Sequence, residues 1–380
     1  DIHTRPGRRT VLRRADIYRP FIVPLACLRG PRRLYRTRFT ERAFIWLSMA
    51  EPDRSGLALR GCKVQSSDAS ADTVARIGTR GSPLALAQAH EVQRRLAEAH
   101  GIAADRIAIQ IIRTSGDQIQ DRPLYEVGGK ALFTKEIEQA LLAGEIDLAV
   151  HSAKDVPTFL PDGLTLSAWL PREDPRDVFI CPTAASLGAL PRGASIGSSS
   201  PRRRALLARL RPDVKLVNLR GNVETRLRKI AEGEADATVL ALAGLKRLGL
   251  ESKVASILDP HVFLPAAGQG AIVIESRRDD DRITALVAAI DHKPTEIAMA
   301  AERGFLALLD GSCRTPIAAH CKVEADGIHL RGMIVSPDGQ EAYETERRGA
   351  ASNAATMGAD AARELRARAG EKFFTLFGGV

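Results

Sequence analysis

Cysteine is scarce in this sequence, and its spacing excludes two kinds of framework. The 380 residues contain five cysteines, with no CxxC pair and no histidine at metal-ligand spacing from a cysteine. A disulfide scaffold and a zinc site are therefore not supported. We expect reduced cysteines in an intracellular protein. The five are Cys27, Cys62, Cys181, Cys313 and Cys321.

Long apolar runs are absent as well. No stretch reaches the roughly eighteen apolar residues that a membrane helix needs. No apolar signal-peptide core precedes an A-x-A site. We therefore expect neither secretion nor a membrane partner.

The net charge of +9 is confined to one end of the chain. Residues 1–48 hold twelve arginines, no lysine and three acidic residues, whereas the remainder holds 43 basic and 43 acidic residues. Because the body of the chain is electrically balanced, we expect no nucleic-acid partner.

This arginine-rich leader shows no sustained apolar periodicity, so we expect residues 1–73 to be disordered. Targeting peptides are usually serine-rich, but Ser48 is the only serine of residues 1–48, and Met49 is the first methionine. We favour a segment that lies upstream of the true start, with organelle targeting as the alternative.

From Val74 onward, short apolar strands alternate with amphipathic helices, which is typical of α/β layering. The pattern predicts strands at 76–78 and 107–112 and a buried parallel-type strand at 146–150. Ser82-Pro83 predicts a helix start. Ligands bind beyond the carboxyl ends of such strands, so residues 151–155 are a candidate site.

A second lobe follows a proline-rich stretch, 171–182, which we interpret as a crossover. Strands are predicted at 195–197, 214–219 and 237–240, with helices that begin near Pro201 and Asn222. Residues 264–270 then predict a second hinge before a strand at 271–275.

After Pro294 the pattern predicts a long helix, three strands joined by tight turns at Asp326-Gly327 and Asp338-Gly339, and a final helix. The fold class is therefore α/β, with two doubly wound binding-protein-like lobes joined by hinge crossings, plus a small C-terminal α+β domain. We expect domain 1 to span 74–172 plus 271–290, domain 2 to span 173–270 and domain 3 to span 291–380.

Three basic clusters lie where strands should end and helices begin, at residues 79–82, 198–204 and 219–226. Arginines and backbone N–H groups at a helix N-terminus bind anions, and arginine suits bidentate capture of carboxylate or phosphate. Solvated helix starts are the alternative for any one cluster. Three in register across two lobes favour an anion site.

Asp155 is the acid that accompanies these clusters. A helix cap or turn is the alternative role for such an aspartate. A carboxylate among anion-binding arginines must either pair with them or meet positive charge on the ligand. The sequence therefore suggests a substrate with several carboxylates and one cationic centre.

From about Val74 to the C-terminus the sequence resembles the hydroxymethylbilane synthase family, also called porphobilinogen deaminases. The motifs occur in the same order, whereas residues 1 to about 72 match nothing in the family. The matching segments are RIGTRGSPLA at 76–85, VGGKALF at 127–133, HSAKDVP at 151–157, LRGN at 219–222, LPAAGQG at 264–270 and GSC at 311–313.

The resemblance implies a cytoplasmic, monomeric enzyme of tetrapyrrole biosynthesis that condenses four porphobilinogen molecules with loss of ammonia and then hydrolyses off hydroxymethylbilane. Cys313 would hold a dipyrromethane cofactor through a thioether. Asp155 would stabilise the cationic azafulvene left when ammonia departs and help move protons.

The resemblance also assigns the polar contacts. Lys130 would lie on a mobile segment, 114–130, that could cover the cleft. The cofactor contacts would be Arg80, Ser82, Lys154, Ser200, Arg202, Arg203 and Arg220, and the substrate contacts Arg80, Lys130, Arg220 and Arg226.

The sequence is also compatible with two other classes of protein. A two-lobe solute-binding protein would bind anions without reacting, and it would leave Cys313 and Asp155 without a role. A cysteine acyl-transfer enzyme would need a basic histidine near Cys313, for which His320 is available in sequence but falls on a predicted strand.

Overall fold

The computed structural model describes residues 73–118, 132–309 and 315–376. All of them belong to the second of two units into which the chain divides, Ser66–Val380. Cys313, Lys130 and the leader of residues 1–72 lie outside the described residues.

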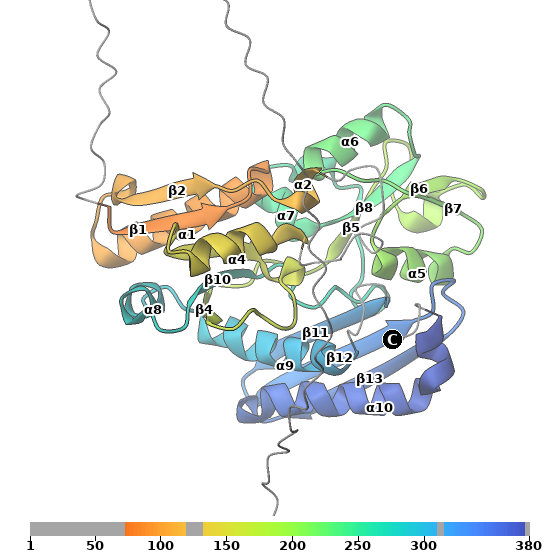
Figure 1. Cartoon of the computed structure of the whole chain (residues 1–380). Helices are drawn as coiled ribbons and strands as arrows, with labels where there is room; N and C mark the ends of the chain where they lie inside the picture. Colours follow the sequence, from red (N-terminus) through yellow and green to blue (C-terminus); the bar gives the residue numbers. More distant parts are fainter. Residues whose placement is uncertain (1–72, 119–131, 310–314, 377–380) are drawn as a thin grey trace, which may run out of the picture. The chain divides into compact units, whose positions relative to one another are not determined.

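The first five-stranded sheet has the strand order β2-β1-β3-β10-β4 (Figure 1). Strands β1 and β3 run parallel, as do β1 and β2, whereas β10 is antiparallel to β3 and β4. Strand β3 is therefore buried as predicted, but it is parallel on one side only. The strands are β1 (Ala75–Thr79), β2 (Ile107–Ile111), β3 (Leu148–Ser152), β4 (Leu164–Trp169) and β10 (Ile272–Arg277).

Helices cover both faces of this sheet. One apolar cluster joins it to α1 (Pro83–His100) and α8 (Asp281–Ala288), and another joins it to α4 (Lys135–Leu142). The short helix α2 (Ser115–Gln118) follows β2. Burial on both faces explains the near-continuous apolar run of β3.

The second sheet, β7-β6-β8-β5-β9, repeats this plan with three parallel strands and an antiparallel strand beside them. Its helices α5 (Pro201–Leu210) and α6 (Val223–Ala231) begin as predicted, and α7 (Leu242–Arg247) follows β8. The strands are β5 (Asp177–Ile180), β6 (Ser195–Gly197), β7 (Lys215–Val217), β8 (Ala237–Ala241) and β9 (Ser256–Ile257).

The crossover prediction for 171–182 was wrong in part, because β5 lies inside it. The prolines that suggested a linker, at 171, 175 and 182, flank this strand, and Val178, Phe179 and Ile180 between them are buried. The first crossing is therefore confined to the residues between β4 and β5.

The two crossings lie side by side. The Glu173 N–H donates to Gly270 O at 3.2 Å, and the Gln269 side chain donates to Pro175 O at 2.7 Å. Gly270 has φ +89°, and a Cβ there would lie 2.2 Å from Glu173 O. A side chain at this position would force the crossings apart.

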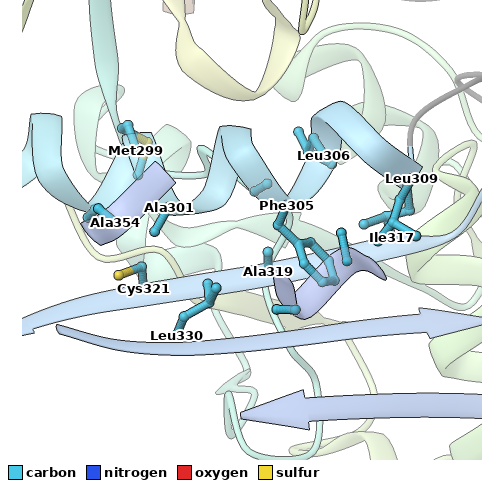
Figure 2. Packing of buried hydrophobic residues seen from close by; sticks show 14 of the residues in the cluster. Met299, Ala301, Phe305, Leu306, Leu309, Ile317, Ala319, Cys321, Leu330 and Ala354 are labelled. Carbon is cyan, nitrogen blue, oxygen red and sulfur yellow. The ribbon is translucent and has the colours of Figure 1, made fainter. Parts of the chain in front are cut away.

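The third sheet is an antiparallel meander of β11 (Ile317–Glu324), β12 (Gly327–Val335) and β13 (Ala342–Gly349). Helices α9 (Lys293–Leu309) and α10 (Ala354–Thr375) pack against each other and against this sheet. Figure 2 shows the Phe305 ring pointing from α9 toward the sheet, and a Cβ at Gly332 of β12 would lie 2.5 Å from that ring.

The third sheet and its helices α9 and α10, together called the third unit of the fold, share apolar clusters with both lobes. Its α9 packs with Val156, Trp169 and Val273 of the first lobe, while Met333 and Val335 pack with the second. In the part of the chain that the structure describes, no helix is long and apolar enough to cross a membrane.

Candidate functional site

A cavity of about 780 Å³ lies where the amino ends of α1, α5 and α6 meet the second crossing, which contributes residues 266–271 except Gly268. The three basic clusters predicted from the sequence all contribute to its lining. The candidate residues that line it are Arg80, Ser82, Lys154, Asp155, Ser200, Arg202, Arg203, Arg220 and Arg226.

The first cluster begins α1. The Ala85 N–H donates to Ser82 Oγ at 3.3 Å, and Pro83 occupies the first helical turn, so the predicted N-cap is confirmed. Arg80 forms a two-pronged ion pair with Asp117 and lies 4.2 Å above the Phe133 ring.

The second cluster begins α5, where Ser200 Oγ accepts the Arg203 N–H at 3.4 Å. Arg202 and Arg203 form ion pairs with Asp177, each at 2.8 Å, and all three side chains are nearly or fully buried. Although burial raises the pKa of Asp177, the two arginines hold it below its usual value. One carboxylate thus faces two guanidinium groups, which leaves surplus positive charge beside the cavity.

The third cluster begins α6 and carries two arginines without a carboxylate partner among the described residues. Arg220 Nη1 is buried and has no hydrogen-bond partner there, and Arg226 donates to Gly221 O at 2.9 Å. Burial lowers the pKa of Arg226 to about 10, and repulsion from Arg203 contributes. Partly buried guanidinium groups without a carboxylate partner among the described residues favour an anionic ligand.

Asp155 lies in the 3₁₀ turn Ala153–Asp155 directly after β3, at the predicted carboxyl end of the sheet. It forms no ion pair with a described residue, although its charge acts on Lys154 and Arg226. Lys154 Nζ lies 3.4 Å from Gln269 Oε1. Burial lowers the pKa of Lys154 to about 8, and Asp155 offsets part of that decrease.

The described lining holds eight basic and two acidic side chains, so the cavity is strongly cationic around one free carboxylate. A ligand that fits this distribution carries several anionic groups and one cationic centre. The size is within the usual range for small-molecule sites.

Sequence reasoning missed several lining or supporting residues. Asp117 and Asp177 escaped notice because their partners lie 37 and 26 positions away in sequence, and no local pattern links them. The position of Asp177 directly before the apolar run Val178–Ile180 was the signal that could have identified it. Other lining residues that were missed are Gln88, Arg113, Phe133, Arg247 and Gln269.

Cys313 and Lys130 were predicted site residues that fall outside the described residues. Described neighbours of Cys313 in the chain do line the cavity, namely Leu306 before it and Thr315 and Ile317 after it.

His320 is a poor general base. Burial and the nearby Arg172 lower its pKa to about 3, and it lies on β11 as predicted. The cysteine acyl-transfer interpretation therefore loses the base that it requires.

Cys321 is equally unsuited to nucleophilic chemistry, because burial, with a contribution from Glu302, raises its thiol pKa to about 12. At pH 8 Cys321 is therefore almost entirely in the unreactive thiol form. We expect iodoacetamide to modify the half-buried Cys181 much faster than Cys321 in the native protein, with both modified in denaturant, as measured by peptide mass spectrometry. Equal native rates would contradict the buried thiol.

The fold and the cavity together define a two-lobe α/β protein whose cationic cavity suits a small polyanion. Residues 75–285 match the family model described as porphobilinogen deaminase, dipyromethane cofactor binding domain, and residues 296–367 match the porphobilinogen deaminase C-terminal domain. The chain belongs to the porphobilinogen deaminase family. It is a transferase that makes hydroxymethylbilane from porphobilinogen with a dipyrromethane cofactor.

Curated relatives extend this similarity over most of the chain. The porphobilinogen deaminase of Nitrobacter winogradskyi is 69% identical over 317 residues, covering 83% of this chain and 100% of the relative. That of Nitrobacter hamburgensis is 68% identical over 309 residues, covering 81% and 98%. Among solved structures, the periplasmic VFT2 domain of Bordetella pertussis BvgS is 18% identical with a TM-score of 0.35, covering 57% of this chain and 86% of that domain.

The described residues fit a dipyrromethane group. Two linked pyrrole units that each carry an acetate and a propionate present four carboxylates, which suit a cavity with eight basic side chains. The buried and unpartnered Arg202 Nε and Arg220 Nη1 are donors that such carboxylates could satisfy.

Proposed function

We propose that hydroxymethylbilane synthesis takes place in the 780 Å³ cavity, with Asp155 as the catalytic carboxylate. The observation that carries this proposal is a carboxylate without an ion-pair partner among the described residues, set in a lining that is otherwise cationic. A carboxylate that the protein leaves uncompensated is available to positive charge on the substrate.

Asp155 would accept a hydrogen bond from the pyrrole N–H of the substrate. It would stabilise the positive charge that develops on that ring as the carbon–nitrogen bond to the departing ammonia breaks. Lys154, with its pKa of about 8, keeps most of its charge at neutral pH and would contact a carboxylate beside the reacting ring.

The arginines would divide between positioning and binding. Arg220 and Arg226, which lack a carboxylate partner among the described residues, would bind carboxylates directly. Arg202 and Arg203 would keep one edge on Asp177 and turn remaining donors toward the cofactor. Arg80, Ser82 and Ser200 would complete the cofactor contacts, with Arg80 and Lys130 also contacting the substrate.

Dipyrromethane supplies the primer on which the chain grows, and Cys313 would hold it through a thioether. The support for Cys313 is its place in the chain between Leu306 and Thr315, which both line the cavity.

We also propose the domain limits 74–172 plus 271–290, 173–270 and 291–380. They are supported by the division of the strands among three sheets. A monomer in the cytoplasm is the assembly and location that we propose for a biosynthetic enzyme of this family.

Intact-mass spectrometry of protein from a host that makes porphobilinogen tests the tether. We expect the native protein to exceed its sequence mass by one dipyrromethane group, and the Cys313→Ser variant to lack this addition. Cys181→Ser is the matched control, because Cys181 is half-buried on the second lobe, and it should keep the addition. An unmodified native mass would argue against the tether and for a binding protein without covalent chemistry.

A further inference from the structure

The carboxylate of Asp117 is paired with Arg80, an arginine that the substrate would need. Its carboxylate faces the Arg80 guanidinium from the side, with Arg80 Nε 3.2 Å from Asp117 Oδ2 and Arg80 Nη2 on Oδ1. Thr114 Oγ1 donates to the same Oδ2 at 2.7 Å. Arg80 and Asp117 both line the cavity. This two-pronged arrangement is the geometry in which arginine captures any carboxylate.

The pair differs from the arginine–carboxylate pairs that hold the fold together. The side chains of Arg80 and Asp117 are 24% and 34% exposed, whereas those of Arg203 and Asp177 are 7% and 0% exposed. Separating a buried pair leaves uncompensated charge, but water can solvate the members of a partly exposed pair when they part. The Arg80–Asp117 pair is therefore exchangeable, and the Arg203–Asp177 pair is not.

The surroundings of Arg80 would keep its guanidinium in place during such an exchange. The Phe133 ring lies 4.2 Å from the guanidinium carbon and contacts its face, which leaves its edge for a carboxylate. Burial raises the pKa of Asp117, but hydrogen bonds from Arg80 and Thr114 outweigh this and hold it below its usual value. Asp117 is thus an anion at neutral pH and competes for Arg80 with full charge.

We propose that Asp117 is an internal competitor for Arg80. Its carboxylate pairs with the edge of the Arg80 guanidinium and is displaced there by a substrate carboxylate, so that Asp117 sets the affinity of Arg80 for the substrate. The inference rests on the proposed function, in which Arg80 contacts cofactor and substrate. Exchange of one carboxylate for another keeps Arg80 paired whether or not ligand is bound. It also prevents Arg80 from binding the carboxylates of each added pyrrole unit so tightly that the growing pyrrole chain can no longer shift through the cavity.

Asp117→Asn is the direct test, because asparagine keeps the shape and can still accept the Thr114 hydrogen bond but carries no charge. We expect the KM for porphobilinogen to fall by about three- to fivefold, the size of effect typical of an ion pair that water can reach. Because tighter binding also slows the movement of the growing pyrrole chain through the cavity, kcat should stay unchanged or fall. Loss of a merely structural contact would raise KM or lower thermal stability instead.

Thr114→Val provides a second variant that leaves the Asp117 charge in place but removes one of its supports. Thr114→Val should also lower the KM for porphobilinogen, by a smaller factor than Asp117→Asn does. Asp213→Asn is the matched control, because Asp213 forms a similar two-pronged pair with Arg211, at 2.7 and 2.8 Å, and neither residue lines the cavity. Its KM should equal that of the wild type.

An unchanged or raised KM in Asp117→Asn, with normal turnover by the wild type, overturns the competitor role. If Asp117→Asn does not fold, the direction of the KM change in Thr114→Val decides the question in the same way. Absence of turnover by the wild type would instead contradict the proposed function itself.

Discussion

Asp155→Asn is expected to lower the turnover of porphobilinogen by about 10²- to 10⁴-fold, the range lost with a positioned acid–base or charge-stabilising group. Asparagine has the same shape and forms hydrogen bonds, but it neither carries the negative charge nor accepts a proton. Since Asp155 has no ion-pair partner among the described residues, its replacement should leave the fold intact. Steady-state assays, with thermal unfolding alongside, measure both effects.

The covalent addition detected by intact mass should persist in this variant, which separates loss of turnover from loss of the primer. Asp236→Asn is a suitable control, because Asp236 pairs with Ser195 at the amino ends of β6 and β8, the edge opposite to the carboxyl ends that meet the cavity. It should retain normal turnover. Near-normal consumption of porphobilinogen by Asp155→Asn would remove Asp155 from its proposed role.

Local chemistry explains which parts of this site were predictable from the sequence. Ser82-Pro83, Ser200-Pro201 and Asn222 specify helix starts within a few residues of themselves, and all three caps are present. Each cap directs backbone N–H groups and a neighbouring arginine toward the carboxyl edge of a sheet. The part of the cavity lining that lies at these helix starts could therefore be inferred without knowing how the two lobes meet.

The partners of these arginines could not be inferred in the same way. Asp177 at the start of β5 pairs with Arg202 and Arg203 at the start of α5 because the fold of the second lobe brings the two segments together, and no local pattern in the sequence predicts that. Strand β5 was not predicted from the sequence, because the prolines on both sides of it favour turns and it contributes only three buried apolar residues. Sequence patterns report local preferences, whereas ion-pair partners are set by topology.

Glu302 shows how one buried carboxylate can hold three distant segments together. It is fully buried and accepts hydrogen bonds from Arg172 on the first crossing, the Gly268 N–H on the second, and the Cys321 N–H of β11. The distances run from 2.6 to 3.1 Å. The crossings and the third unit therefore meet at a single charged group.

Glu302→Ala should accordingly be the most destabilising of the substitutions considered, with a loss of about 3–5 kcal/mol in the free energy of unfolding. The variant would leave the Arg172 charge and two backbone N–H groups buried without their acceptor. Glu302→Gln should cost less, because one amide oxygen can still accept while the NH₂ group faces other donors. Urea unfolding followed by circular dichroism gives both values.

Glu364→Ala is the matched control, because Glu364 also accepts from several donors, namely Thr345, Arg347 and Arg368, but its side chain is 31% exposed. Water can solvate the donors that it leaves behind, so a loss of only about 0–1 kcal/mol is expected. Equal losses for the two alanine variants would mean that the Glu302 cluster is not the junction of the three segments. A much larger loss at Glu302 would tie the stability of both crossings, and hence the geometry of the cavity beside Asp155, to that one carboxylate.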